Sequence, residues 1–184
     1  MNTTYIIVAV VLVLLVLGAI LAPIFSGRQR SKHFQSKYGA EYDRAVETTG
    51  GKKAAQTELK ERERHIRTLN IRPLSTAERE RYAKDWAVVQ AKFVDEPGHA
   101  TEEADRLIRE VMQLRAYPVS DFEQRAADVS IQYPALVANY RAARAIAVLN
   151  EQHHAGTEDL RRAMIHYRSL FDELLKPEGN TEAA

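Results

Sequence analysis

The hydrophobic positions of the chain follow two patterns. From Tyr5 to Phe25 they form an unbroken apolar run without a charged residue. Further along, apolar residues recur every three or four positions, the spacing of one buried helix face. Strand signals, such as alternating Val, Ile and Thr or an Asn-Gly turn, are absent from that remainder of the sequence. The pattern predicts an all-α protein with one N-terminal transmembrane helix, a basic helical stalk and a compact bundle of about four or five helices.

The run from Tyr5 to Phe25 is long enough to cross a bilayer, since a helix rises about 1.5 Å per residue and the hydrocarbon core is roughly 30 Å thick. A cleaved signal peptide is disfavoured because residues 1–4 carry no charged side chain and Pro23 follows the best small residue, Ala22. A buried core helix is disfavoured because the run has no polar face. We expect residues 1–27 to form an uncleaved single-pass anchor.

Orientation follows from the flanks of this run. No Lys or Arg precedes it, and Arg28, Arg30, Lys32 and Lys37 follow it. Because cytoplasmic flanks carry the Lys/Arg excess, we expect the N-terminus outside and the C-terminal domain in the cytoplasm, at the cell inner membrane. The same four cations are the candidate residues for contact with lipid headgroups. Their simpler interpretation is that they set topology and keep the stalk solvated.

Charge is unevenly divided along the chain. Residues 28–72 hold 12 Lys and Arg against 6 Asp and Glu, whereas residues 73–184 hold 14 against 19. The basic half therefore follows the anchor and the outer half is acidic, which argues against nucleic acid as a partner. The chain has no cysteine, which excludes thiolate zinc sites and cysteine nucleophiles.

The stalk is predicted over residues 28–72 as two helices. The first, over 31–48, ends at Gly50 and Gly51, because adjacent glycines are poor in a helix interior. The second, over 52–69, has a heptad-like apolar face that also carries Arg62. We interpret this face as packing onto later helices of the same chain, with weak self-association through the stalk as the alternative. The apolar positions of the two helices are Phe34, Tyr38, Tyr42 and Val46, then Ala55, Leu59, Ile66 and Leu69.

The bundle is predicted over residues 73–176, followed by a flexible tail over 177–184, with five or six helices in all after the membrane. Ser75 and Glu78 form a capping-box pattern, and the helix that it opens carries an aromatic stripe of Tyr82, Trp86 and Phe93 with Val89. Later helices are expected over 101–115, 122–129, 134–149 and 157–174. The last is expected to have Thr157 as its cap and to bury Leu160, Met164, Tyr167, Leu170, Phe171 and Leu174.

Catalytic and cofactor patterns are absent from the sequence. There is no Gly-x-Ser-x-Gly elbow, phosphate-binding loop or dinucleotide fingerprint, and no pair of histidines has helical metal-ligand spacing. We therefore assign no catalytic, cofactor-binding or metal residue and predict a protein that is not an enzyme. A rival hypothesis is an enzyme or ligand-binding domain whose site forms only in three dimensions, with Arg125, His166 or Tyr167 converging in a deep pocket.

The least periodic ordered segment covers residues 117–128. It mixes aromatic side chains with polar groups, and Arg125 can pair with Asp121 or Glu123. Asp121 or residue 120 can cap the short helix that follows. We interpret the segment as a structural corner in which Arg125 satisfies helix ends, with a partner-binding surface as the alternative. The candidate residues are Tyr117, Pro118, Asp121, Phe122 and Arg125.

Four segments together resemble a group of uncharacterised bacterial single-span proteins, usually described as membrane or secreted proteins. They cover residues 38–46, 71–74, 117–128 and 166–171, and the part from Asp121 to Asp128 is the most specific. In that group the first segment commonly has proline where this chain has Ala40. The group has no established activity, so the resemblance implies the architecture and transfers no functional residue.

These observations lead to one functional expectation. The chain is predicted to be a membrane-anchored interaction or scaffold protein whose partners are the lipid bilayer and another protein. The tether would raise the effective concentration of the bundle toward other membrane proteins. The alternatives are a lipid-surface or envelope-associated component, and the enzyme or ligand-binding domain described above.

Overall fold

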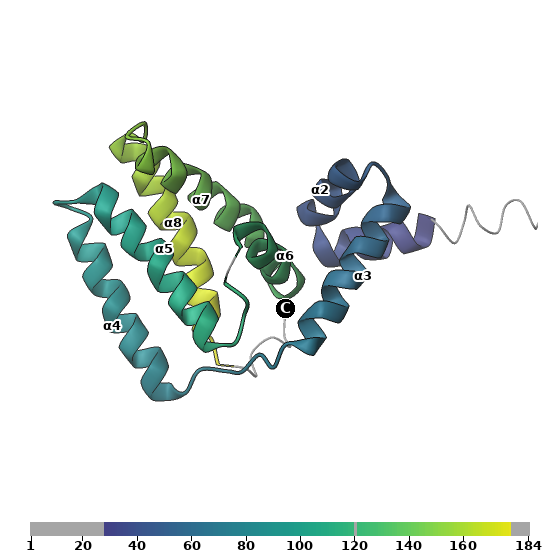
Figure 1. The fold of residues 1–184 in the computed structure, drawn as a ribbon, viewed down its shortest axis with the longest axis horizontal. Coiled ribbons are helices and arrows are strands. Elements are labelled where there is room, and N and C mark those ends of the chain that lie inside the picture. Colours follow the sequence, from purple (N-terminus) through teal and green to yellow (C-terminus); the bar gives the residue numbers. More distant parts are fainter. Residues whose placement is uncertain (1–27, 120, 178–184) are drawn as a thin grey trace, which may run out of the picture.

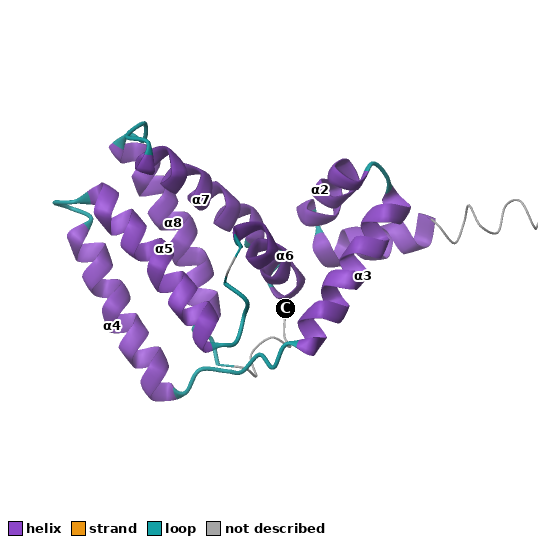
Figure 2. Ribbon diagram, in the orientation of Figure 1, coloured by secondary structure: helices purple, strands orange, loops and turns teal. Residues whose placement is uncertain are grey.

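The computed structural model describes residues 28–119 and 121–177, and these residues form helices joined by turns, with no strand among them (Figure 2). The all-α prediction is confirmed. None of the helices in these ranges is long and apolar enough to cross a membrane. The predicted span, Tyr5 to Phe25, lies outside the described residues, as does the predicted tail beyond residue 177.

Within residues 28–119 and 121–177, eight helical segments follow one another, where five or six were expected. Residues 28–38 are helical. The numbered helices are α2 (Ala40–Thr49), α3 (Lys52–Thr68), α4 (Thr76–Lys92), α5 (Pro97–Leu114), α6 (Phe122–Gln132), α7 (Val137–Glu151) and α8 (Thr157–Leu174). Figure 1 shows α4, α5 and α8 side by side, α7 and α6 next to them, and α2 and α3 on the far side of α6.

The bundle consists of α4 to α8 and has one continuous apolar core. The predicted stripe of α4 lies in it, with Tyr82, Trp86 and Val89 buried and Phe93 partly buried. Trp86 stacks on Phe171 of α8 with ring centroids 4.5 Å apart, so helices far apart in sequence share one aromatic contact. The apolar positions predicted for α8 are all buried.

Helix starts in the bundle follow local capping chemistry. Ser75 accepts from the Glu78 amide while the Glu78 carboxylate accepts from the Ser75 amide, which confirms the capping box. Helix α5 begins at Pro97, before the predicted start at residue 101, because proline suits the first helical turn. The prediction of Thr157 as a cap is wrong. Gly156 holds that position, and its amide donates to the Asp159 carboxylate.

Residues 28–68 form a separate unit, which we call the N-terminal hairpin. It has its own apolar cluster of Phe34, Tyr38, Tyr42, Ala45, Ala55 and Leu59. The continuous helix predicted over 31–48 is wrong, because the chain turns at Gly39, whose φ is 52°. A left-handed backbone of this kind suits glycine. The predicted break at Gly50, with φ 76°, is confirmed.

The hairpin packs against the bundle through two helix pairs, α3 on α6 and α2 on α7. The predicted apolar face of α3 divides between the two cores, since Leu59 lies in the hairpin cluster and Ile66 in the bundle cluster. After α3 the chain is fixed to the bundle, because the Arg72 amide donates to the Arg115 carbonyl over 3.2 Å. This arrangement leaves a space between the hairpin and α6–α7, which holds the candidate site.

Candidate functional site

The predicted corner after α5 is tied into the bundle. Arg125 is buried, and its Nε donates to Tyr140 Oη over 2.7 Å while its Nη1 donates to the Val119 carbonyl over 2.6 Å. The expected pairing of Arg125 with Asp121 or Glu123 is not formed in the described structure. Asp121 instead caps α6, where its Oδ2 accepts from the Gln124 amide over 2.8 Å.

The other three corner residues also contact the chain itself. Phe122 packs its ring against Tyr140 at 5.1 Å between centroids. Tyr117 is buried and its hydroxyl donates to Gln132. Pro118 is partly buried beside it. Four of the five corner residues are therefore buried or partly buried in the fold, and Asp121 is exposed.

The four cations predicted to contact lipid headgroups, Arg28, Arg30, Lys32 and Lys37, lie on the first described helix and are all exposed. Lys37 reaches α3 and pairs with Glu63 at 2.6 Å. Arg28, Arg30 and Lys32 form no ion pair with any described residue. The structure therefore separates one cation that fastens the hairpin from three that face solvent.

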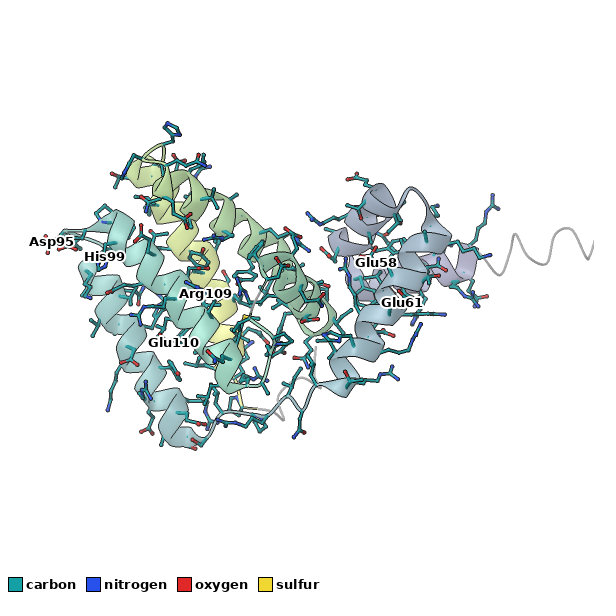
Figure 3. The ribbon with its side chains drawn as sticks, in the orientation of Figure 1. Glu58, Glu61, Asp95, His99, Arg109 and Glu110 are labelled. Carbon is teal, nitrogen blue, oxygen red and sulfur yellow. The ribbon has the colours of Figure 1, made fainter. Side chains whose placement is uncertain are left out.

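A polar hollow of about 590 Å³ lies between the hairpin and the bundle, and we call it the charged groove. Helices α2, α3, α6 and α7 all contribute to it, and Figure 3 labels two of its carboxylates, Glu58 and Glu61, along α3. It is lined by Arg44, Thr48, Glu58, Glu61, Arg62, His65, Asp121, Glu123, Gln124, Ala127 and Arg141. Sequence reasoning had placed only Asp121 among the candidate site residues.

Beneath the groove, a buried carboxylate joins three helices. Glu41 of α2 accepts from Arg62 of α3 over 2.8 Å and from Arg141 of α7 over 3.2 Å. Arg141 also donates to Glu123 of α6 over 2.7 Å, and Arg62 also pairs with Glu58 and Ser130. Because Glu41 is almost fully buried, losing either arginine would leave its charge undercompensated in a dry environment.

A second buried carboxylate, Asp128, faces the groove wall. Its Oδ1 accepts from Gln124 over 3.0 Å and lies 3.7 Å from His65 Nε2, and both neighbours line the groove. Burial raises the pKa of the Asp128 carboxyl, against the lowering effects of the Gln124 hydrogen bond and of His65 and Arg62. Its Oδ2 has no hydrogen-bond partner, and the same holds for His65 Nε2 and Arg141 Nε. Such atoms are rare in folded proteins. These three lie in or behind the groove lining, whereas a fourth, Trp86 Nε1, lies in the bundle core.

A smaller hollow of about 430 Å³ lies between α5 and α7. Its buried Asp105 accepts from Tyr167 Oη over 3.1 Å and pairs with Arg109, labelled in Figure 3, over 3.1 Å. Burial, followed by the charge of Asp105, raises the pKa of Tyr167. Neither of these two hollows is lined by Arg125, His166 or Tyr167.

No group of three or more His, Asp or Glu side chains within residues 28–119 and 121–177 is arranged to hold a metal ion. His153 and His154 lie exposed in the turn between α7 and α8. Comparison with known proteins adds no assignment: no protein-family model matches the chain, and neither a curated protein nor a solved structure matches it significantly.

Arg62 gave the clearest sequence-level signal for the groove. It is a charged residue on the otherwise apolar face of α3, and such a residue needs a buried partner. Glu41 shares that signal weakly, since it stands beside Tyr42 in a buried stripe. Arg141 and Asp128 meet these residues only through the fold.

Proposed function

We propose that this chain is a membrane-anchored, non-catalytic interaction scaffold whose charged groove binds a segment of a partner protein. The observation that carries the proposal is the groove itself, which four helices build and charged side chains line. Small-molecule sites are mostly apolar and enclose their ligand. A polar, open hollow fits a polypeptide better.

The anchor in this proposal is the apolar run from Tyr5 to Phe25. The hairpin that carries one wall of the groove begins directly after that run, so the groove would be held close to the bilayer. The Lys/Arg excess after the run supports a cytoplasmic bundle at the inner membrane. Confinement to the membrane would raise the encounter rate with other membrane proteins.

A lipid-surface role is the second candidate. It is favoured by Arg28, Arg30 and Lys32, which are exposed and unpaired among the described residues. Each such cation near an anionic bilayer contributes about 1 kcal/mol of attraction.

Site-specific photocrosslinking in intact membranes tests the scaffold proposal. A photoreactive residue replaces Thr48, an exposed groove residue, or Lys84, an exposed residue of α4 that does not line the groove. We expect a discrete protein adduct from position 48, none from position 84, and loss of the adduct when Glu61→Lys is added. Equal protein adducts from both positions, or no protein adduct, would contradict the proposal. Adducts to phospholipid alone would support the lipid-surface role.

A further inference from the structure

We propose that the charged groove recognises a basic side chain, lysine or arginine, presented by the partner polypeptide. This inference rests on the proposed function and specifies the chemistry of the bound segment. The inference follows from two comparisons: which charged side chains of the groove already form ion pairs within the chain, and which are exposed to solvent.

Each arginine of the groove pairs with a carboxylate of the chain. Arg44 pairs with Glu123 over 3.4 Å. Arg62 donates to Glu41, Glu58 and Ser130. Arg141 donates to Glu41 and Glu123. An incoming anion would have to displace carboxylates that the chain itself supplies. The groove is therefore poorly suited to phosphate or to an acidic peptide.

The carboxylates of the groove are in excess and exposed. The lining contains four of them against three arginines, and Glu41 and Asp128 add two more directly behind it. Glu61 is 61% exposed and its ion pair with Arg64 is long, at 3.9 Å. Glu123 is 65% exposed but already pairs with Arg141 over 2.7 Å and with Arg44 over 3.4 Å. A cation entering the groove would therefore meet Glu61 as its least engaged acceptor.

The wall of the groove adds an independent observation. Asp128 is completely buried, its Oδ1 contacts two lining residues, and its Oδ2 has no partner. An unsatisfied acceptor of this kind costs about 1–3 kcal/mol. A guanidinium or ammonium group seated beside His65 would place a positive charge close to this buried carboxylate, whose Oδ1 lies 3.7 Å from His65 Nε2. It would also favour the charged form of a carboxyl whose pKa is raised by burial.

The size of the groove points to a side chain on a polypeptide. A volume of about 590 Å³ exceeds the space that a single ion needs, and the described residues offer no three-ligand metal cluster. Arginine and lysine bring an apolar stem with a charged end, which suits an open hollow with carboxylates at its rim and Asp128 behind its wall.

The test uses the full chain in a neutral detergent and a fluorescent hexa-arginine peptide as the probe, with binding followed by anisotropy. A hexa-glutamate peptide is the charge-reversed probe. We expect hexa-arginine to bind and hexa-glutamate not to bind. Glu58→Gln combined with Glu61→Gln should weaken hexa-arginine binding about tenfold, as expected for the loss of two exposed ion pairs. Glu61→Lys alone should weaken it as well. Among the described residues the ion pair of Glu61 is with Arg64 of its own helix, so this variant leaves the buried network intact.

The matched control is Glu80→Gln combined with Glu110→Gln, which removes two carboxylates that do not line the groove. It should bind hexa-arginine as the unmodified chain does. Equal weakening in the control and the groove variants, or preferential binding of hexa-glutamate, would overturn the inference. If groove photocrosslinks to protein persist and Glu61→Lys changes neither them nor peptide binding, recognition of a cation is overturned while a polypeptide-binding groove stands.

Discussion

At the scale of single residues, Glu78 combines two stabilising roles at the start of α4. Its carboxylate closes the capping box on the Ser75 amide over 2.7 Å. The same group receives a two-pronged contact from Arg72, over 2.8 and 3.0 Å. Arg72, and then the Ser75 amide, lower the pKa of Glu78 from 4.5 to about 2. Charged Glu78 therefore stabilises the folded chain.

The Glu78→Gln variant should consequently lose stability in a pH-dependent way. Because the folded pKa is lowered, the stabilisation is present above pH 4.5 and is lost as the pH falls towards about 2. Thermal unfolding of the full chain in neutral detergent should show Glu78→Gln melting below the unmodified chain at neutral pH. The difference should shrink across that window. A constant difference down to pH 2 would contradict this reading of the carboxylate.

The residue scale also shows what local sequence can predict. The capping box was predictable because Ser75 and Glu78 stand three positions apart and bond to each other's amides. The contact from Arg72 was not predictable, since Pro73 and Leu74 must first turn the chain. The role of Arg125 was open for the same reason: its partner Tyr140 belongs to another helix.

At the scale of elements, two neighbouring glycines between α2 and α3 have different backbone requirements. Gly50 has φ 76°, whereas Gly51 has φ 172°, an extended value that any residue adopts. A Cβ added at either position would have no heavy atom within 4 Å. A methyl side chain would therefore meet no steric obstacle from neighbouring atoms at either position, and the two sites differ only in backbone conformation.

Alanine substitutions should separate these requirements. Gly50→Ala should destabilise the chain by about 1 kcal/mol, because an L-residue is strained in the left-handed region. Gly51→Ala should be neutral or slightly stabilising, because it restricts the unfolded chain. Chemical denaturation of the full chain, followed by circular dichroism, measures both. An equal effect of the two variants would show that the turn relaxes around residue 50.

Helix faces were largely predictable, and several helix ends were not. The stripes of α4 and α8 repeat at helical spacing with large side chains, and a single buried face is their direct consequence. Gly39 was missed because it interrupts the stripe of Phe34, Tyr38 and Tyr42 without changing its period. One glycine is tolerated within a helix, so its left-handed turn had no unambiguous sequence signal.

At the scale of the whole molecule, two apolar cores meet across a polar interface. Ile131 contacts both clusters, and around it lie the charged contacts of Glu41, Arg62 and Arg141. Polar interfaces of this kind allow relative motion more readily than apolar ones. Docking of the hairpin onto the bundle therefore combines the buried ion network with the apolar contacts of Ile66 and Ile131.

Arg141→Gln should loosen that docking. It removes one of the two arginines on Glu41 and the main partner of Glu123, at a cost on the order of 3 kcal/mol. Because the chain has no native cysteine, spin labels at Lys53→Cys and Lys84→Cys report the hairpin–bundle distance directly. We expect a broader, longer distance distribution in Arg141→Gln. The control Arg168→Gln, on the exposed side of α8, should leave the distance distribution unchanged. An unchanged distribution in Arg141→Gln would show that other contacts hold the hairpin on the bundle.

The groove lay beyond sequence prediction because its members are distant along the chain. Glu41 and Arg141 are separated by 100 positions, and no sequence pattern indicates that the two residues meet. The division into a basic and an acidic half describes averages over long segments. It does not show that basic and acidic side chains of both halves meet at one interface.

Trp86 is the sole tryptophan of the chain, and it stacks on Phe171 inside the larger core. The smaller core contains tyrosine and phenylalanine but no indole ring. Intrinsic tryptophan emission therefore reports melting of α4–α8 and is silent when residues 28–68 detach or unfold. A single cooperative fluorescence curve would not demonstrate that both halves unfold together.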